Sequence, residues 1–239
     1  MKVLTISRLA HAMVLMDFAG TFVLADPWFA KKPARLGPPS SVGAADMPGL
    51  SLILISGNGA DRSDWKNLAA YPDKSVSIAG PASQLKSASK NSFNCFTAME
   101  KPWEEHRIGP LLLLSGPGLP QGEQMSAVLQ CAGFTVFWGG NSLFDPRMAQ
   151  VLQHANRPDV AFLPVSRSTG GLLSSKCGMA PEEAAGICAV LNPQVVVPIG
   201  EGAASDNARK FAAACAIFAP ETKVKVLSAG AVYQHKSAR

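Results

Sequence analysis

Residues 50–62 read LSLILISGNGADR and join a buried strand to a polar loop. Leu50–Ile55 is a nearly continuous apolar run, which is typical of a strand covered on both faces. The Gly-Asn-Gly sequence at 57–59 ends that strand. A helix is then predicted up to Ala70, with Asp61 or Ser63 as its N-cap. A strand, a polar loop and a helix in succession indicate an α/β fold.

The rest of the chain repeats these signals on both sides of residues 50–62. Asp17 to Gly20 supplies a hairpin turn between two short strands, and Met125–Gln130 is compatible with a strand or a short helix. Strands are predicted at Val3–Ile6, Ala12–Met16, Thr21–Leu24, Val76–Ile78, Leu111–Ser115, Phe134–Trp138, Val160–Pro164, Val195–Pro198 and Lys223–Leu227, and helices at Met148–Asn156, Pro181–Leu191 and Ser205–Ala214. The segments 31–49 and 84–108 are expected to be long surface loops.

The strands come in two runs, and each run continues into strand–helix alternation. This order favours an α/β protein (α+β in some schemes) built as an αββα sandwich, with two mixed β-sheets and helices on the outer faces. Other α/β arrangements share the same pattern. With 239 residues the chain fits a single domain, 1–239, that has a large buried core.

Composition excludes several classes of protein. Hydrophobic residues make up 47% and charged residues 16%, which is incompatible with an intrinsically disordered chain. The net charge of +5 is mild and no basic run occurs, so we expect no nucleic-acid partner. No apolar run of about 18 residues is present, so no membrane span is expected.

The N-terminus and the cysteines indicate a cytoplasmic protein. Arg8, His11 and Asp17 interrupt the apolar N-terminal segment, which disfavours a secretion signal. The cysteines are odd in number and widely spaced, as in a reducing compartment. They are Cys95, Cys131, Cys177, Cys188 and Cys215. Cys177, beside Lys176, is the best candidate for a reactive thiol, although no partner histidine can be assigned.

Seven segments in the same order resemble the metallo-β-lactamase-fold hydrolases. The branch that they resemble most includes the L-ascorbate-6-phosphate lactonase-like proteins. A His-Ala pair opens an early strand, Asp-Pro-Trp follows a later one, and Met-x-Pro-Glu-Glu-Ala begins a helix. The segments are His11–Leu15, Leu24–Trp28, Leu52–Asp61, Phe137–Phe144, Asp159–Pro164, Met179–Ala185 and Asn192–Pro198.

The resemblance also implies where metal ligands should stand, and most of those residues are replaced. The family loop reads His-x-His-x-Asp-His and holds zinc or manganese, but here Gly57, Gly59 and Arg62 replace its histidines. Of the ligand positions in this loop, only Asp61 keeps the residue type of the family. The bridging aspartate falls on Asn141 or, with a shift of one residue, on Gly140, and the final histidine falls on Gly200. One carboxylate does not hold a catalytic zinc, so we expect no metal and no other cofactor.

The remaining histidines and one glycine-containing segment suggest no replacement site. His106, His154 and His235 are expected at the surface. The segment Ser166–Gly171 lacks the pattern of a phosphate-binding loop and is predicted to be a flexible loop.

If the fold is correct, a set of polar residues gathers where the metal would have been. One interpretation is a small pocket that binds an anionic or carbonyl-bearing ligand. The other is a filled cleft, in which Asp61 caps a helix and Arg62 reaches solvent. The candidate ligand-binding residues are His11, Asn58, Asp61, Arg62, Asn141 and Glu201.

These interpretations lead to three hypotheses about function. The first is a metal-free pseudoenzyme that binds a small ligand or a protein partner. The second is a metal-independent enzyme of hydrolase or lyase type, in which Asp61 or Glu201 is the general acid or base and Arg62 stabilises an oxyanion. The third is a structural subunit whose apolar surface is covered by a protein partner or by another copy in a homo-oligomer.

Overall fold

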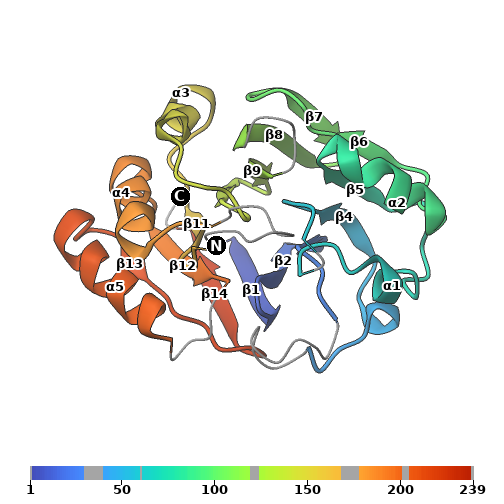
Figure 1. Ribbon diagram of the computed structural model, residues 1–239, viewed down its shortest axis with the longest axis horizontal. Coiled ribbons are helices and arrows are strands. Elements are labelled where there is room, and N and C mark those ends of the chain that lie inside the picture. The colour runs from blue at the N-terminus through green and yellow to red at the C-terminus, as the bar shows by residue number, and fades with distance from the viewer. Residues whose placement is uncertain are drawn as a thin grey trace, which may run out of the picture.

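Two β-sheets pack face to face between outer helices, as Figure 1 shows. This computed structural model describes residues 2–29, 40–59, 61–118, 124–167, 178–200 and 205–237. The architecture confirms the predicted αββα sandwich of two mixed sheets.

The first sheet has seven strands in the order β14-β1-β2-β3-β4-β5-β6. The strands from β14 to β3 pair antiparallel, whereas β3, β4, β5 and β6 run parallel. The bounds are β1 Val3–Ala10, β2 Met13–Phe18, β3 Thr21–Ala25, β4 Leu50–Leu54, β5 Ser77–Gly80, β6 Phe96–Ala98 and β14 Val232–Lys236.

The second sheet also has seven strands, in the order β13-β12-β11-β10-β9-β8-β7. The strands from β10 to β13 run parallel, and those from β7 to β10 pair antiparallel. The bounds are β7 Glu105–Ile108, β8 Leu111–Gly118, β9 Met125–Cys131, β10 Phe134–Trp138, β11 Val160–Pro164, β12 Val195–Ile199 and β13 Lys223–Val224.

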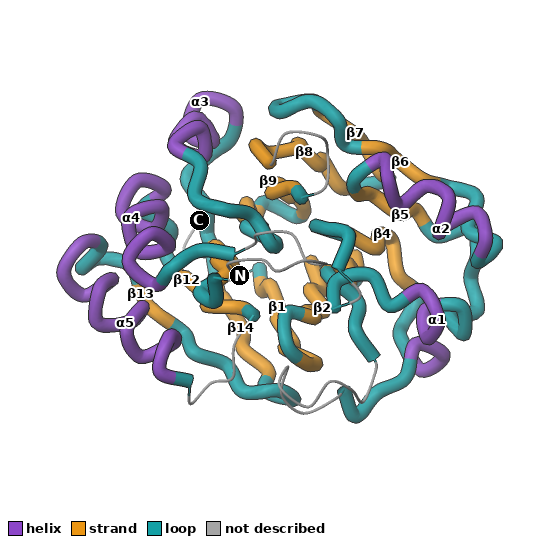
Figure 2. Tube along the Cα trace, in the orientation of Figure 1, coloured by secondary structure: helices purple, strands orange, loops and turns teal. Residues whose placement is uncertain are grey.

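Helices cover the outer face of each sheet, as the colours of Figure 2 make clear. Helices α4 and α5 pack on β10–β12, while α1 and α2 pack over β3–β5. The bounds are α1 Trp65–Leu68, α2 Leu85–Lys90, α3 Val151–His154, α4 Pro181–Leu191 and α5 Asp206–Phe218, with 3₁₀ helices at Ala44–Asp46, Ala82–Gln84 and Pro146–Gln150.

The principal core lies between the two sheets. Strand β1 alternates buried and half-buried residues, whereas every residue of β10, β11 and β12 is buried. Trp138 and Phe162 are fully buried in this core with ring centroids 5.0 Å apart. Apolar runs therefore mark the strands covered on both faces, and alternation marks the strand with one covered face.

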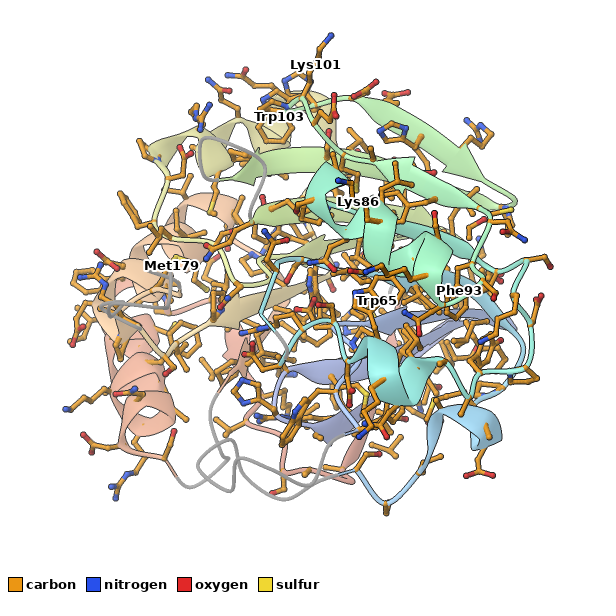
Figure 3. The ribbon with its side chains drawn as sticks, turned by 45° about the vertical axis from the view of Figure 1, so that its right-hand side comes forward. Trp65, Lys86, Phe93, Lys101, Trp103 and Met179 are labelled. Atoms are coloured by element: carbon orange, nitrogen blue, oxygen red, sulfur yellow. The ribbon has the colours of Figure 1, made fainter. Side chains whose placement is uncertain are left out.

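Several local predictions were wrong. Residues 84–108 are not a single loop, because they contain α2, β6 and β7. Helix α1 is short, and its N-cap is Asp64 rather than Asp61 or Ser63. Trp65 of α1 packs against Phe93, and both are labelled in Figure 3. This tertiary contact helps to hold a helix that is too short to be stable alone.

The three histidines expected at the surface differ in their exposure. His154 is exposed and stacks on Trp103, which is labelled in Figure 3, with ring centroids 4.6 Å apart. His106 is half-buried. His235 is 5% exposed, so its surface prediction was wrong. It lies in β14, a strand that the sequence did not predict, with its ring edge-on to Phe134.

The structure can be compared with the predictions about membrane spans and cysteines. Within the described part of the chain, no helix has the length and apolar character that a membrane span requires. Cys131, Cys188 and Cys215 are buried free thiols and Cys95 is exposed. Cys177, like residues 168–171 of the predicted flexible loop, lies outside the described residues. The cytoplasmic location stays a prediction.

The core between the sheets should dominate stability. Replacing Phe162 with Ala removes a fully buried ring and leaves a cavity, which we expect to lower the free energy of unfolding by about 3–5 kcal/mol. The matched control is Ile217→Ala in α5, where the side chain is 75% exposed and a change within about 0.5 kcal/mol is expected. Urea denaturation measures both. Equal losses in the two variants would contradict this assignment of the core.

Candidate functional site

Polar side chains from both sheets meet at one edge of the sandwich. Asp26 follows β3, Ser56 follows β4, and Asn141 follows β10. Because the carboxyl ends of parallel strands lie at one edge of a sheet, the loops after them come together there. The backbones are also joined, since Met125 N donates to Ser56 O over 2.9 Å. This edge is where the sequence predicted the site.

Gly140 allows the two sheets to approach closely at this edge. Its φ is +56°, in the left-handed region that favours glycine. A Cβ atom at this position would lie 2.4 Å from Ser56 Cβ, which is closer than atoms can approach. The turn after β10 therefore presses directly against the end of β4.

Asp26 is fully buried at this edge, with 0% exposure, as is Ser56. Its Oδ1 accepts a hydrogen bond from Ser56 N at 2.8 Å, and its Oδ2 accepts one from Ser56 Oγ at 2.6 Å. Arg62 Nη1 donates to the same Oδ2 at 3.0 Å. Burial raises the pKa of Asp26, while the Arg62 charge and the Ser56 hydrogen bonds act against that rise.

The guanidinium of Arg62 lies at the centre of the cluster and is 2% exposed. Besides Asp26, it donates from Nη2 to Asn141 Oδ1 at 3.1 Å and from Nη1 to Gly140 O at 3.5 Å. Its Nε is 3.5 Å from Asp61 Oδ2, within ion-pair range but without hydrogen-bond geometry. Arg62 therefore does not reach solvent, contrary to the filled-cleft interpretation.

His11 and Asp61 pair beside the guanidinium, and Asp61 is the accessible member of the pair. His11 Nε2 lies 3.3 Å from Asp61 Oδ2, and the carboxylate side chain is 27% exposed. Trp28 packs edge-on against the imidazole at a centroid distance of 5.9 Å. His11 Nδ1 is buried without a hydrogen-bond partner among the described residues.

These contacts set the ionisation of the pair. Burial alone would raise the pKa of Asp61, but the His11 hydrogen bond and the Arg62 charge lower it to about 2. Burial lowers the pKa of His11, and the charges of Arg62 and Arg8 reinforce this against the effect of Asp61. Near neutral pH the cluster therefore combines an ionised Asp61 with an uncharged His11.

The structure brings four of the six candidate residues together, namely His11, Asp61, Arg62 and Asn141. Asn58 instead turns toward the first sheet's outer layer, where its Oδ1 accepts hydrogen bonds from Ser83 at 2.7 Å and Gln84 at 2.8 Å. Glu201 lies outside the described residues. Asp61 does not cap α1, which Asp64 does.

Sequence reasoning missed Asp26 and Ser56 as members of the site. Asp26 was quoted only within the Asp-Pro-Trp segment, yet it directly follows the buried end of β3. A carboxylate at the carboxyl end of a parallel strand, beside a strand followed by Asp61 and Arg62, was the signal that could have identified it.

The described residues do not fit a metal ion. No three His, Cys, Asp or Glu side chains in the described ranges are grouped so as to hold one. The guanidinium of Arg62 lies within 3.0 Å of Asp26 and 3.5 Å of Asp61, so a second cation there would meet a fixed positive charge. An arginine side chain also offers no lone pair for coordination.

The chain matches one known protein family over most of its length. The family described as the beta-lactamase superfamily domain matches residues 5–200. The chain belongs to this superfamily. The sandwich is of the metallo-β-lactamase type, as the resemblance implied. A comparison with curated proteins gave no match.

Solved structures support the metallo-β-lactamase fold. A metallo hydrolase from Ignicoccus hospitalis is 16% identical, with a TM-score of 0.73 over 98% of this chain and 99% of that one. An isothiocyanate hydrolase from Delia radicum gut bacteria is 14% identical, with a TM-score of 0.72 over 96% and 98%. A metallo-β-lactamase fold protein from Bacillus subtilis is 12% identical, with 0.73 over 98% and 100%. At such identities the likeness extends to the fold alone.

Acid titration should reveal the interaction of Asp61 with its neighbours. Its pKa is lowered from 3.8 to about 2 on folding, so its contribution to stability is complete above pH 3.8 and is lost as the pH falls through about 2. The free energies of unfolding of wild type and Asp61→Asn should therefore approach one another by about 1.5 kcal/mol between pH 5 and pH 2.5. Urea titrations at the two pH values measure this, and a constant difference would exclude the interaction.

Proposed function

We propose that this protein is a metal-free pseudoenzyme of the metallo-β-lactamase fold that binds a small ligand or a protein partner. The observation that carries the proposal is the buried guanidinium of Arg62, which lies among Asp26, Asp61 and Asn141 at the edge where the resemblance implies the family's metal site. Metal-assisted hydrolysis needs a cation with an open coordination position for water or substrate. Arg62 supplies the charge but not the coordination position.

The residues around Arg62 agree with this proposal. Gly57, Gly59 and Gly200 carry no ligating side chain. Asn141 uses its carbonyl oxygen to accept from Arg62, and Asp26 uses both carboxylate oxygens inside the protein. We also propose, from the seven segments that resemble it, that the chain is related to the L-ascorbate-6-phosphate lactonase-like branch, and that residues 1–239 act as one domain.

The exposed part of the edge restricts the ligand. Arg62 is buried, whereas the ionised Asp61 is partly accessible, so the charge facing solvent is negative. A small ligand would offer N–H or O–H donors to Asp61. An anionic or carbonyl group, which the sequence suggested, would have to be held by other groups of the edge. A protein partner or a second copy of the chain is the other proposed binder.

A metal-independent hydrolase or lyase is the second candidate, and the His11–Asp61 contact favours it. With its pKa lowered to about 2, Asp61 is a carboxylate near neutral pH and would act as a base or orient His11 rather than as a general acid. The buried Arg62 is already engaged and would need to move to stabilise an oxyanion. Asp61→Asn would abolish turnover if this candidate is correct.

Metal analysis tests the leading proposal. Protein purified without chelator should contain far less than one equivalent of zinc, manganese or iron per chain, measured by plasma mass spectrometry. Added Zn²⁺ or Mn²⁺ should leave the midpoint of thermal unfolding unchanged, because a ligand that does not bind the native state does not stabilise it. One equivalent of a tightly held metal in the wild-type protein would overturn the proposal.

A further inference from the structure

We propose that Arg62 acts as a built-in cation, whose guanidinium links the two sheets at this edge and keeps divalent cations out of it. The inference rests on the proposed metal-free function and goes beyond it, because it assigns a structural role to Arg62. It concerns what holds the edge together in place of a metal ion.

The link between the sheets is visible in the contacts of Arg62. Asp26 follows β3 in the first sheet, whereas Gly140 and Asn141 follow β10 in the second. Nη1 donates to Asp26 Oδ2 at 3.0 Å and to Gly140 O at 3.5 Å, and Nη2 donates to Asn141 Oδ1 at 3.1 Å. One planar group thus joins strand ends from both sheets.

The charges explain why the group has to be a cation. Asp26 is fully buried, and Asp61 is close enough to share the same positive charge. A buried carboxylate without a counter-charge is strongly destabilising. Arginine suits this position because its charge is permanent and its N–H groups point in several fixed directions.

Gly59 provides space that this arrangement needs. A Cβ atom at Gly59 would lie 2.3 Å from Asp61 Oδ1, so a side chain there would push the carboxylate aside. Gly200 borders the guanidinium more loosely, since a Cβ atom there would lie 3.6 Å from Arg62 Nη2, which is an ordinary van der Waals contact.

The same geometry shows what would remain without the guanidinium. Asp26 Oδ2, Asp61 Oδ2 and Asn141 Oδ1 all face Arg62, and His11 Nε2 lies 3.3 Å from Asp61 Oδ2. Carboxylate oxygens and an imidazole nitrogen are ligands that Zn²⁺ and Co²⁺ accept. With Arg62 between them, the described side chains are not grouped as a metal site, so a cation that replaces the guanidinium has to draw Asp26, Asp61 and His11 together. Removal of Arg62 should convert this edge into a cation site.

The experiment compares Arg62→Ala with the wild type and with Arg62→Lys, which keeps a positive charge. Co²⁺ is the probe, followed by its visible absorption and by equilibrium dialysis. Arg62→Ala should bind about one Co²⁺ per chain, and its midpoint of thermal unfolding should rise by about 5 °C or more in the presence of the ion. The wild type and Arg62→Lys should show neither effect. The double variant Arg62→Ala/Asp61→Asn should lose the binding, since a ligand is missing.

Arg62→Ala that binds no more Co²⁺ than the wild type would overturn the inference, and so would binding that Asp61→Asn does not reduce. If Arg62→Ala folds only with Co²⁺ present, that result supports it. If Arg62→Ala does not fold in either condition, Arg62→Gln and Arg62→Gln/Asp26→Asn decide the matter. Neutralising Asp26 should restore folding, and failure to do so contradicts the inference. Stoichiometric metal in the wild type would defeat the proposed function together with the inference, whereas the results above would defeat the inference alone, so the two failures are distinct.

Discussion

The buried contact between Asp26 and Arg62 is the interaction on which this edge of the molecule depends. Asp26 has 0% exposure and Arg62 has 2%, so water contributes little to the solvation of either charge. A carboxylate in such a position needs a cation and hydrogen-bond donors at once. Arg62 and Ser56 supply them. The positions of the loops after β3, β4 and β10 follow from this requirement.

The chemistry of the site follows from the same contact. Since Arg62 is held by Asp26, Gly140 and Asn141, its charge lowers the pKa of Asp61 and opposes protonation of His11. The cluster thus presents an ionised carboxylate and an uncharged imidazole near neutral pH. A metal centre of this fold would supply a Lewis acid with an open position. The described residues supply a buried ion pair, which has no open coordination position, instead.

Much of the sandwich could be predicted from apolar periodicity. Continuous apolar runs such as Leu50–Ile55 and Val160–Pro164 indicated strands buried on both faces, because successive side chains of a strand point to opposite faces and both faces are covered here. Strand β14 escaped prediction because it lies at the edge of its sheet and pairs only with β1, and its exposed Val232 and mixed polar residues carry no clear period. His235 is buried for a tertiary reason, the approach of Phe134.

The candidate site was predictable in part, for similar reasons. The resemblance to the metallo-β-lactamase fold implied that Asp61, Arg62 and Asn141 lie at one edge, and they do meet there. The burial of Arg62 was not predictable, since it depends on Asp26, a residue 36 positions away in the sequence. Asn58 left the cluster because Ser83 and Gln84 offer it two donors. The sequence indicates which residues lie at the same edge. The direction of each side chain is decided by the hydrogen-bond partners that distant segments offer it.

The coupling free energy between Asp26 and Arg62 tests this account most directly. It is obtained from urea denaturation of the wild type, Asp26→Asn, Arg62→Gln and the double variant near neutral pH. The account predicts that each single variant is clearly destabilised and that the double variant is less so than the sum, with a coupling of about 2–3 kcal/mol. Additive losses, with a coupling within about 0.5 kcal/mol of zero, would contradict the claim that this pair holds the edge together.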